Sequence, residues 1–341
     1  MTSRIHRWSL LASMAVFAGC TTSAPVANAT KPPLSGSVSA IGSGAVAGSA
    51  RVVGLRQPFG VAAAEDSIWV TEYGAGNLVR IDPKTMGVIA RTRVGPHASY
   101  VVVQSGVVWV VDDLGGNVIG VDTRTNLITK TIPLRPTANL RPSAIAAADG
   151  TIWVTLGFEN QATITGPSWH GLLVRILPTT TATPESLSLP GILVGVTADG
   201  GTVWVASQLE PSTVYRIDSA TRQVVATIPT GHPITGALAY LSPDLWVANQ
   251  DGYLTQIDAR TNRVVGNFEV GSPEWPALVA EANAIWISAP LDNLVARFDP
   301  QTHEISTALH TAGRPQLFAF AGGALWVANY VDGTLVKLPL P

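Results

Sequence analysis

Short stretches in which apolar residues alternate with small or polar ones recur from about residue 50 to the end of the chain. Seven of them contain the same three positions: an apolar residue, a tryptophan, and a valine or isoleucine. The tryptophans are Trp69, Trp109, Trp153, Trp204, Trp246, Trp286 and Trp326. They are 40, 44, 51, 42, 40 and 40 residues apart, and a period of this length with four strand-sized segments is typical of a propeller blade. The pattern therefore predicts an all-β fold, a seven-bladed β-propeller over residues 50–341.

The fifth repeat shows the expected order of strands within one blade. Its alternation predicts strands over 235–240, 245–248, 253–257 and 264–269, bounded by turn-forming residues. We name these strands A to D, with A innermost. In five repeats an aspartate followed three positions later by threonine ends strand C, namely Asp82, Asp122, Asp218, Asp258 and Asp299. Because such a carboxylate accepts N–H bonds from the next residues, these aspartates are predicted to close the C-to-D hairpin.

The seventh repeat lacks a fourth strand. Its apolar stretches lie near 317–321, 325–329 and 334–338, and the chain then ends. Residues 50–55 precede the first blade directly, where every other repeat has its strand D. We predict that this segment pairs with the three C-terminal strands and closes the ring, which removes two open sheet edges.

The amino-acid composition and the net charge limit the kinds of molecule that this chain is expected to bind. Charged residues make up only 13% of the chain, hydrophobic residues make up 46%, and there are 32 glycines. This balance suits many short strands joined by tight turns. The formal net charge is -2, and a nucleic-acid-binding surface would need a basic stripe to neutralise phosphates. No nucleic-acid partner is therefore expected.

The first 20 residues have the order of an export signal: cationic residues up to Arg7, an apolar run over 8–18, and then Gly19 and Cys20. The run is too short to span a bilayer. Cys20 is the only cysteine, and the residues before it resemble the lipobox of bacterial lipoproteins, which implies that Cys20 is lipidated. Cleavage after Ala29 is the alternative, and it would leave a soluble exported protein.

Residues 21–48 consist mostly of alanine, serine, threonine, glycine and proline. This composition predicts a flexible tether between the signal segment and the propeller. Both cleavage routes place the propeller outside the cytoplasm, in the bacterial cell envelope. A lipidated chain would be a periplasmic or outer-membrane lipoprotein that contacts the membrane through its lipid anchor only.

Two segments carry a family resemblance. Residues 68–82 read IWVTEYGAGNLVRID, and residues 224–233 read VVATIPTGHP. Over about residues 50–341 the chain resembles the YVTN/YncE-like seven-bladed propellers and the related streptogramin (virginiamycin B) lyases. Membership of the first group implies an exported protein with a binding role. Similarity to the second implies a lyase that opens a cyclic depsipeptide with a histidine and a divalent metal held by glutamate on one face of the propeller.

In such a ring, the D-to-A connections and the B-to-C loops emerge at one end of the central channel, which is therefore the expected binding face. The third repeat carries about eleven extra residues, mostly over 156–170, and such a loop is either a lid over the channel mouth or a neutral insertion. The predicted ligand-binding residues on this face are Phe59, Tyr73, Arg141, Trp169, His170, His232, Asn249, Glu274, Arg314 and Asn329. We expect a small-molecule or peptidic ligand there, or alternatively an envelope protein.

Three further residues are candidates for metal binding or catalysis. Glu72 and Asp112 are predicted to begin the B-to-C loops of adjacent blades, and His97 lies on the connection between those blades. Two carboxylates and an imidazole that converge could hold Mg²⁺ or Ca²⁺, or act as general acid and base. Alternatively, they are solvated loop residues or hairpin caps. Ligand binding without catalysis is the leading hypothesis. The second is a metal-assisted lyase or lactone hydrolase, with His97 catalytic and Glu72 and Asp112 as metal ligands.

Overall fold

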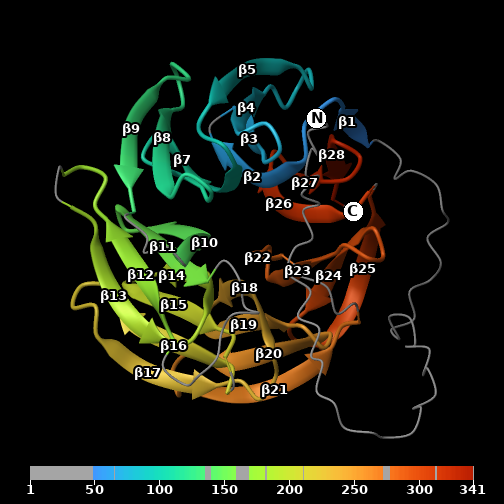
Figure 1. Ribbon diagram of the computed structural model, residues 1–341. Coiled ribbons are helices and arrows are strands. Elements are labelled where there is room, and N and C mark those ends of the chain that lie inside the picture. Colours follow the sequence, from blue (N-terminus) through green and yellow to red (C-terminus); the bar gives the residue numbers. More distant parts are fainter. Residues whose placement is uncertain are drawn as a thin grey trace, which may run out of the picture.

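The computed structural model describes residues 49–64, 66–134, 140–158, 169–180, 183–209, 211–271, 277–311 and 313–340. These residues form seven four-stranded antiparallel sheets arranged as blades around an axis (Figure 1). The predicted all-β, seven-bladed propeller is therefore confirmed. None of the described residues is helical, so this part of the chain has no helix that could cross a membrane. Cys20, Ala29 and the predicted tether over 21–48 lie outside the described residues.

Each blade is a meander in which the strands follow chain order from the axis to the rim. Blade 1 contains β2 (Pro58–Ala64), β3 (Ser67–Glu72), β4 (Asn77–Ile81) and β5 (Val88–Arg93). Blade 2 contains β6 (Ala98–Gln104), β7 (Val107–Asp112), β8 (Asn117–Asp122) and β9 (Ile128–Pro133). Blade 3 contains β10 (Leu140–Ala148), β11 (Thr151–Phe158), β12 (His170–Ile176) and β13 (Glu185–Pro190). Blade 4 contains β14 (Leu193–Asp199), β15 (Thr202–Ser207), β16 (Thr213–Asp218) and β17 (Val224–Pro229).

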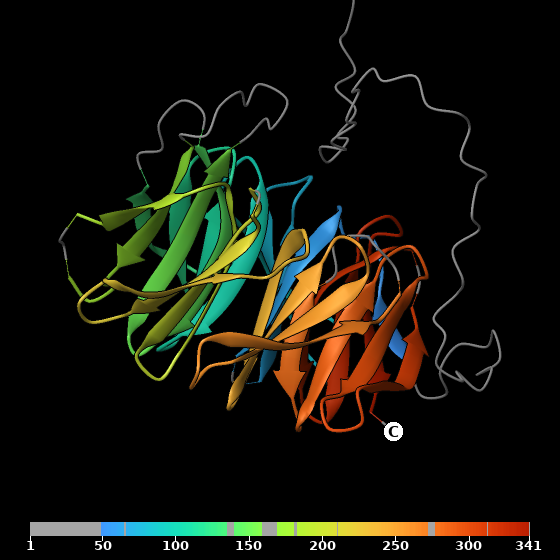
Figure 2. The same ribbon diagram turned by 90° about the horizontal axis from the view of Figure 1, so that it is seen from below.

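The remaining blades repeat this plan. Blade 5 contains β18 (Ile234–Leu241), β19 (Asp244–Asn249), β20 (Tyr253–Asp258) and β21 (Arg263–Glu269). Blade 6 contains β22 (Leu278–Glu281), β23 (Ala284–Ala289), β24 (Leu294–Asp299) and β25 (Glu304–His310). Blade 7 contains β26 (Pro315–Ala321), β27 (Ala324–Asn329), β28 (Thr334–Pro339) and, from the other end of the chain, β1 (Ala50–Val52). Figure 2 shows the ring turned by 90°, with the strands running between its two faces.

The tryptophan of each B strand belongs to the packing between neighbouring blades. Trp69 is fully buried and packs in one cluster with Val110 of blade 2. Ile68 and Val70, on the opposite face of β3, pack with Trp326 of blade 7. Both faces of the strand are therefore buried, because alternate side chains point to opposite sides of a sheet and each side meets a neighbouring blade.

In four blades a cation on strand C covers the tryptophan ring. Its charged group lies between 5.0 and 5.8 Å from the ring centroid, for Arg80 with Trp69, Arg175 with Trp153, Arg216 with Trp204 and Lys337 with Trp326. Three of the cations also reach the next blade: Arg80 donates to Asn126 at 3.3 Å, Arg216 to Asn262 at 2.9 Å, and Lys337 to the Pro83 carbonyl oxygen at 3.1 Å. These contacts add a polar link at the outer part of three of the seams. The sequence pattern did not suggest them.

The ring closes where β1 completes blade 7. Strand β1 pairs antiparallel with β28, with Val52 opposite Leu335. Just after β1, the Leu55 N–H donates to the Gly333 carbonyl oxygen at 3.0 Å. Val52 and Leu55 are both buried in the cluster that contains Trp326. The predicted closure by the N-terminal segment is therefore confirmed.

The repeated aspartates close the C-to-D hairpins as predicted. Asp122 shows the arrangement: its Oδ1 atom accepts the backbone N–H groups of Arg124 at 3.0 Å and Thr125 at 2.9 Å. Equivalent bonds occur at Asp82, Asp218, Asp258 and Asp299. Donation by these backbone N–H groups is the main reason that the pKa of all five carboxyls is lowered. The residues are structural turn caps at the face opposite the predicted binding face.

A bulge interrupts the A-to-B pairing near the start of strand A in six blades. In blade 1 the register shifts between residues 58 and 61, and in blade 2 between 98 and 101. A bulge bends its strand and changes the direction of nearby side chains. Phe59 and Tyr100 lie inside these two bulges, so their side chains leave the regular alternation of β2 and β6.

Candidate functional site

The B-to-C turns and the D-to-A connections meet at one end of the ring, as expected. Backbone hydrogen bonds join them: the Tyr73 N–H donates to the Gln57 carbonyl oxygen at 3.1 Å, and the Gln250 N–H donates to the Pro233 carbonyl oxygen at 2.7 Å. We call this end the BC face. Because strands A and B are the two nearest the axis, residues at the start of A and just after B lie around the axis on this face.

Aromatic side chains from blades 7, 1 and 2 gather there. Phe59 lies with its ring centroid 5.2 Å from that of Tyr100, in an edge-on geometry, and 6.0 Å from that of Tyr73. Tyr73 is in turn 4.6 Å from the imidazole of His97 and 6.5 Å from Tyr330. All five side chains are partly accessible to solvent. Together with Asp113 they form what we call the mouth cluster.

Asp113 supplies the charge of the mouth cluster. Its Oδ1 atom is 3.5 Å from Nδ1 of His97, and its side chain is 21% exposed. Burial raises the pKa of Asp113, while the His97 charge and a hydrogen bond from the Tyr73 hydroxyl act in the opposite direction. Within the described residues Oδ1 accepts no hydrogen bond. Because Oδ1 is also a buried atom, the carboxylate would act on a ligand through its charge.

The tyrosine hydroxyls of the mouth cluster remain protonated at neutral pH. Burial is the largest cause that raises the pKa of Tyr73 and Tyr330, and it raises the pKa of Tyr100 to about 12. For Tyr73 and Tyr100, the nearby Asp113 charge adds to the effect. The rings therefore present neutral hydroxyl donors and electron-rich faces around one carboxylate.

Three of the residues predicted to bind a ligand come together here. Phe59 and Tyr73 belong to the mouth cluster, and Arg141 borders it, since its Nη1 atom donates to the carbonyl oxygens of Asp113 at 3.4 Å and Leu114 at 3.1 Å. The prediction missed Tyr100, Asp113 and Tyr330. Tyr73, Asp113 and Tyr330 share one position, the first residue after strand B, which is a signal that the sequence contained.

Glu72 and Asp112 were expected to begin loops, and the structure corrects this. Both end strand B and are buried, with 1% and 2% exposure. Glu72 accepts the Arg56 N–H at 3.2 Å through Oε1 and the Asn77 side-chain amide at 2.9 Å through Oε2. Asp112 accepts the backbone N–H groups of His97 and Gly115, both at 3.1 Å. Each carboxylate thus braces a turn and a blade connection, which matches the alternative of a hairpin cap.

The expected convergence of His97 with these two carboxylates does not form through its imidazole. That ring faces Asp113, and only the backbone N–H of His97 reaches Asp112. Over the described ranges no three His, Cys, Asp or Glu side chains lie close enough together to hold a metal ion. The side chains of Glu72, Asp112 and His97 therefore form no such group in the described part of the chain, and the Mg²⁺ or Ca²⁺ site stays a prediction.

Other predicted residues are distributed around the BC face. On blade 5, Nδ1 of His232 is 2.6 Å from Oδ2 of Asp251, and its ring stacks on Tyr253 at 4.9 Å. Asn249 and Asn329 are buried at the ends of their B strands, where their side-chain amides donate to the hydroxyls of Thr255 and Thr334. The two asparagines therefore brace hairpins, and a ligand-binding role for them stays a prediction.

The last members of the predicted set lie on blades 3 and 7 or outside the described residues. His170 begins β12 and follows Trp169, and the Arg314 N–H donates to Oδ1 of Asn293 at 2.9 Å. Glu274 and residues 159–168 of the long insertion are outside the described residues. The lid over the channel mouth therefore stays a prediction.

The fold has clear relatives among solved structures, but sequence comparison finds none. No family model matches the chain, and no curated protein matches it. BamB from Moraxella catarrhalis is similar in structure, with a TM-score of 0.55, 13% identity, and coverage of 83% of this chain and 85% of that one. Hydrazine synthase from Kuenenia stuttgartiensis is similar with a TM-score of 0.68, 14% identity, and coverage of 87% and 99%. At this level of identity the likeness shows a β-propeller fold alone.

Proposed function

We propose that the chain is a binding propeller whose mouth cluster takes a small-molecule or peptidic ligand with a cationic group. One observation carries this proposal: a partly buried carboxylate, Asp113, lies among aromatic rings that remain accessible on the BC face. Aromatic faces attract cations, and the attraction grows when water is excluded. A primary ammonium or a guanidinium could then contact the rings and be attracted by the charge of Asp113.

The rest of the arrangement suits a preformed site. Tyr73 and Tyr100 are rigid side chains with few rotatable bonds, so they lose little entropy when a ligand binds. The bulges at 58–61 and 98–101 direct Phe59 and Tyr100 toward the cluster. Sites of this kind combine an apolar lining with a few placed polar groups.

The test is an anisotropy titration with two fluorescein-labelled peptides of the same length, one rich in lysine and one rich in glutamate. We expect saturable binding of the lysine peptide only, and a loss of roughly tenfold in affinity, equal to about 1.4 kcal/mol, for Asp113→Asn. Tyr73→Ala should weaken binding as well. Tyr253→Ala, which removes a ring from blade 5 of the same face, is the matched control and should bind like the original protein. Equal binding of both peptides, or no effect of Asp113→Asn, would contradict the proposal.

We also propose that this binding occurs outside the cytoplasm, in the bacterial envelope. The support is the export-signal pattern over residues 1–20 and the lipobox-like segment that ends at Cys20. Metabolic labelling with a radioactive fatty acid tests the anchor: label in the intact chain and none in Cys20→Ala supports lipidation. Cleavage after Ala29 would give an unlabelled, soluble protein in both cases.

A lyase or lactone hydrolase is the second candidate, and the ion pair of His97 with Asp113 is the observation that favours it. A carboxylate beside an imidazole orients the ring and supports its action as a general base. This second proposal includes a divalent metal ion that assists the reaction. Release of acid from a cyclic depsipeptide, lost in His97→Ala, supports the enzyme, and the metal content of the purified protein, compared with that of Glu72→Gln, tests its metal site.

A further inference from the structure

A second feature of the BC face lies away from the axis, beside blade 1. It is a pocket of about 590 Å³ between the β1–β2 connection, the turn after β3, and the strands β4 and β5. Its lining residues are Gly54, Arg56, Glu72, Gly74, Ala75, Asn77, Arg91 and Arg93. A volume of this size lies within the usual range for small-molecule sites. Of the residues singled out from the sequence, Glu72, a predicted metal ligand, lines this pocket, and none of the ten predicted small-molecule or peptide contacts does.

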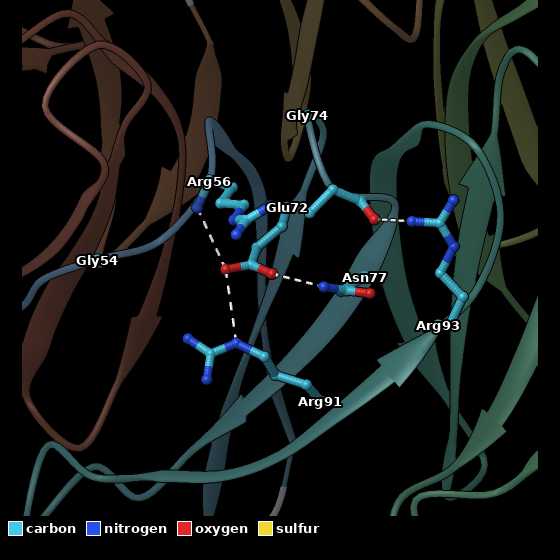
Figure 3. Close-up of a pocket in the computed structure, with 8 residues that line it drawn as sticks. Gly54, Arg56, Glu72, Gly74, Asn77, Arg91 and Arg93 are labelled. Carbon is cyan, nitrogen blue, oxygen red and sulfur yellow. Dashed lines mark hydrogen bonds and ion pairs between the residues drawn. The ribbon is translucent and has the colours of Figure 1, made fainter.

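The pocket is strongly cationic in a chain of net charge -2. Three guanidinium groups, from Arg56, Arg91 and Arg93, surround one carboxylate, that of Glu72. Figure 3 shows Arg56 and Arg91 on one side of Glu72 and Arg93 on the other. The local excess of two positive charges is unusual for a protein in which only 13% of residues are charged.

Glu72 does not neutralise the open part of the pocket. Its side chain is buried, and its oxygens already accept the Arg56 N–H and the Asn77 amide. Arg91 approaches Oε1 of Glu72 with its Nε atom, at 3.6 Å. This contact holds one edge of the Arg91 guanidinium and turns its two terminal nitrogens away from Glu72 (Figure 3).

Two of the three arginines keep donors available. Among the described residues, no hydrogen bond or ion pair engages the terminal nitrogens of Arg91 or the guanidinium of Arg56. Arg93 donates to the Ala75 carbonyl oxygen, which fixes its position at the rim of the pocket. The planar fork of a guanidinium matches carboxylate and phosphate oxygens in pairs. A phosphate monoester carries a charge of about -1.5 to -2 at neutral pH, which matches the local excess.

We propose that this pocket binds the phosphate group of a small-molecule ligand, with Arg56 and Arg91 as the principal donors and Arg93 as a third charge at the rim. The site is separate from the mouth cluster, although Tyr73 follows Glu72 directly in the chain. It therefore goes beyond the proposed function and is tested separately from it.

The experiment follows binding of inorganic phosphate by ³¹P NMR line width at constant ionic strength, with chloride as the replaced ion. We expect saturable broadening for the original protein and a loss of affinity of roughly tenfold in Arg56→Gln and more in the double variant with Arg91→Gln. Arg56→Gln keeps its backbone N–H bond to Glu72, so it should fold normally, which its melting temperature checks. Arg124→Gln removes an exposed guanidinium at the opposite face and is the matched control.

Three results would overturn the proposal. They are broadening that does not saturate, equal affinity of the double variant and the original protein, and displacement of phosphate by an equal concentration of acetate, which would assign the pocket to carboxylates. Tyr73→Ala, which alters the mouth cluster, should leave phosphate binding unchanged. Failure of the cation site and failure of this pocket are thereby distinguishable.

Discussion

The hydroxyl group of Thr71 joins blade 1 to blade 2, because it donates a hydrogen bond to the Ser99 carbonyl oxygen at 2.6 Å. The Oγ1 atom of Thr71 also accepts the Gly60 N–H at 2.7 Å. Both partners lie in the bulges of the innermost strands, so one buried hydroxyl fixes the backbone on which Phe59 and Tyr100 are carried. The geometry of the mouth cluster therefore depends on a residue that does not belong to it.

Replacing Thr71 by valine should destabilise the fold. The change keeps the shape of the side chain but leaves two buried backbone groups without partners, so the free energy of unfolding should fall by about 2 kcal/mol. Thr227 is exposed on β17, and Thr227→Val should change stability by less than about 0.5 kcal/mol. Denaturant unfolding of both variants measures the difference. Equal stability of the two would show that the Thr71 bonds contribute nothing.

Two tryptophans separate the contribution of the ring from that of its N–H group. Nε1 of Trp326 donates to the Ala321 carbonyl oxygen at 3.2 Å, whereas Nε1 of Trp69 has no hydrogen-bond partner among the described residues. Both rings are fully buried and lie under a cation. Trp326→Phe should therefore cost about 1 kcal/mol more than Trp69→Phe. A larger cost for Trp69→Phe in chemical denaturation would refute this account.

Gly195 permits the close approach of two innermost strands. A Cβ atom there would lie 1.8 Å from the Gly236 carbonyl oxygen, so Gly195→Ala should lower stability by about 3 kcal/mol. At Gly150, whose φ is +75°, a Cβ atom would meet nothing within 4 Å. Gly150→Ala should then cost only the backbone strain of about 1 to 2 kcal/mol. Thermal melting of the pair separates steric overlap from strain, and an equal loss in both variants would contradict the overlap.

Removal of residues 50–56 should open the ring. The deletion exposes the surface that Val52 and Leu55 cover and the free edge of β28, and it should cost roughly 3 to 6 kcal/mol from those two side chains alone. Deletion of residues 21–45, which lie outside the described residues, is the control. Equal melting temperatures for the two deletions would show that β1 does not hold the ring closed.

Two aspartates should respond to pH with opposite signs. Burial raises the pKa of Asp113 in the folded protein, so its ionisation increasingly opposes folding as the pH rises above the unfolded-state pKa, and does so fully above the raised pKa. Asp113→Asn should then raise the melting temperature at about pH 7 and have little effect at about pH 3. Both melting curves should be recorded in the same buffers, and a stabilisation that persists at the lower pH would contradict the assignment.

Asp122 is the matched case, because backbone N–H bonds lower its pKa. Its ionised form supports folding above the ordinary pKa of an aspartate, and this support is lost as the pH falls through the lowered value. Asp122→Asn should therefore lower the melting temperature at about pH 7, with the difference disappearing below about pH 2 to 3. A difference that is constant across this range would mean that the charge of Asp122 plays no part.

The fold was predictable because blade packing repeats a local pattern. Trp69 and its six equivalents occupy the same seam in each repeat, and the strands predicted for the fifth repeat differ from β18 to β21 by one residue at most. The site was less predictable, because strand B extends to Glu72 and Asp112. Since side chains alternate between the two faces of a strand, a turn placed one residue too early selects Glu72 and Asp112 instead of Tyr73 and Asp113.

The contacts between blades could not be predicted from the sequence either. Tyr330 comes beside Tyr73 only because the ring brings the last blade next to the first. The arginine pocket combines residues of the β1–β2 connection, which follows the last strand of blade 7, with residues of β5, the outermost strand of blade 1. No local motif marks either arrangement.

The pairing of β1 with β28 joins partners from opposite ends of the chain, and this affects the order of folding. Contacts between such distant segments form late, since the chain between them must be brought into place first. Six blades can assemble from strands that follow one another in the chain, but β1 must wait for its partner β28, which is made much later. Maturation of the protein should therefore end with a docking step, and a peptide that copies residues 49–56 should compete with it.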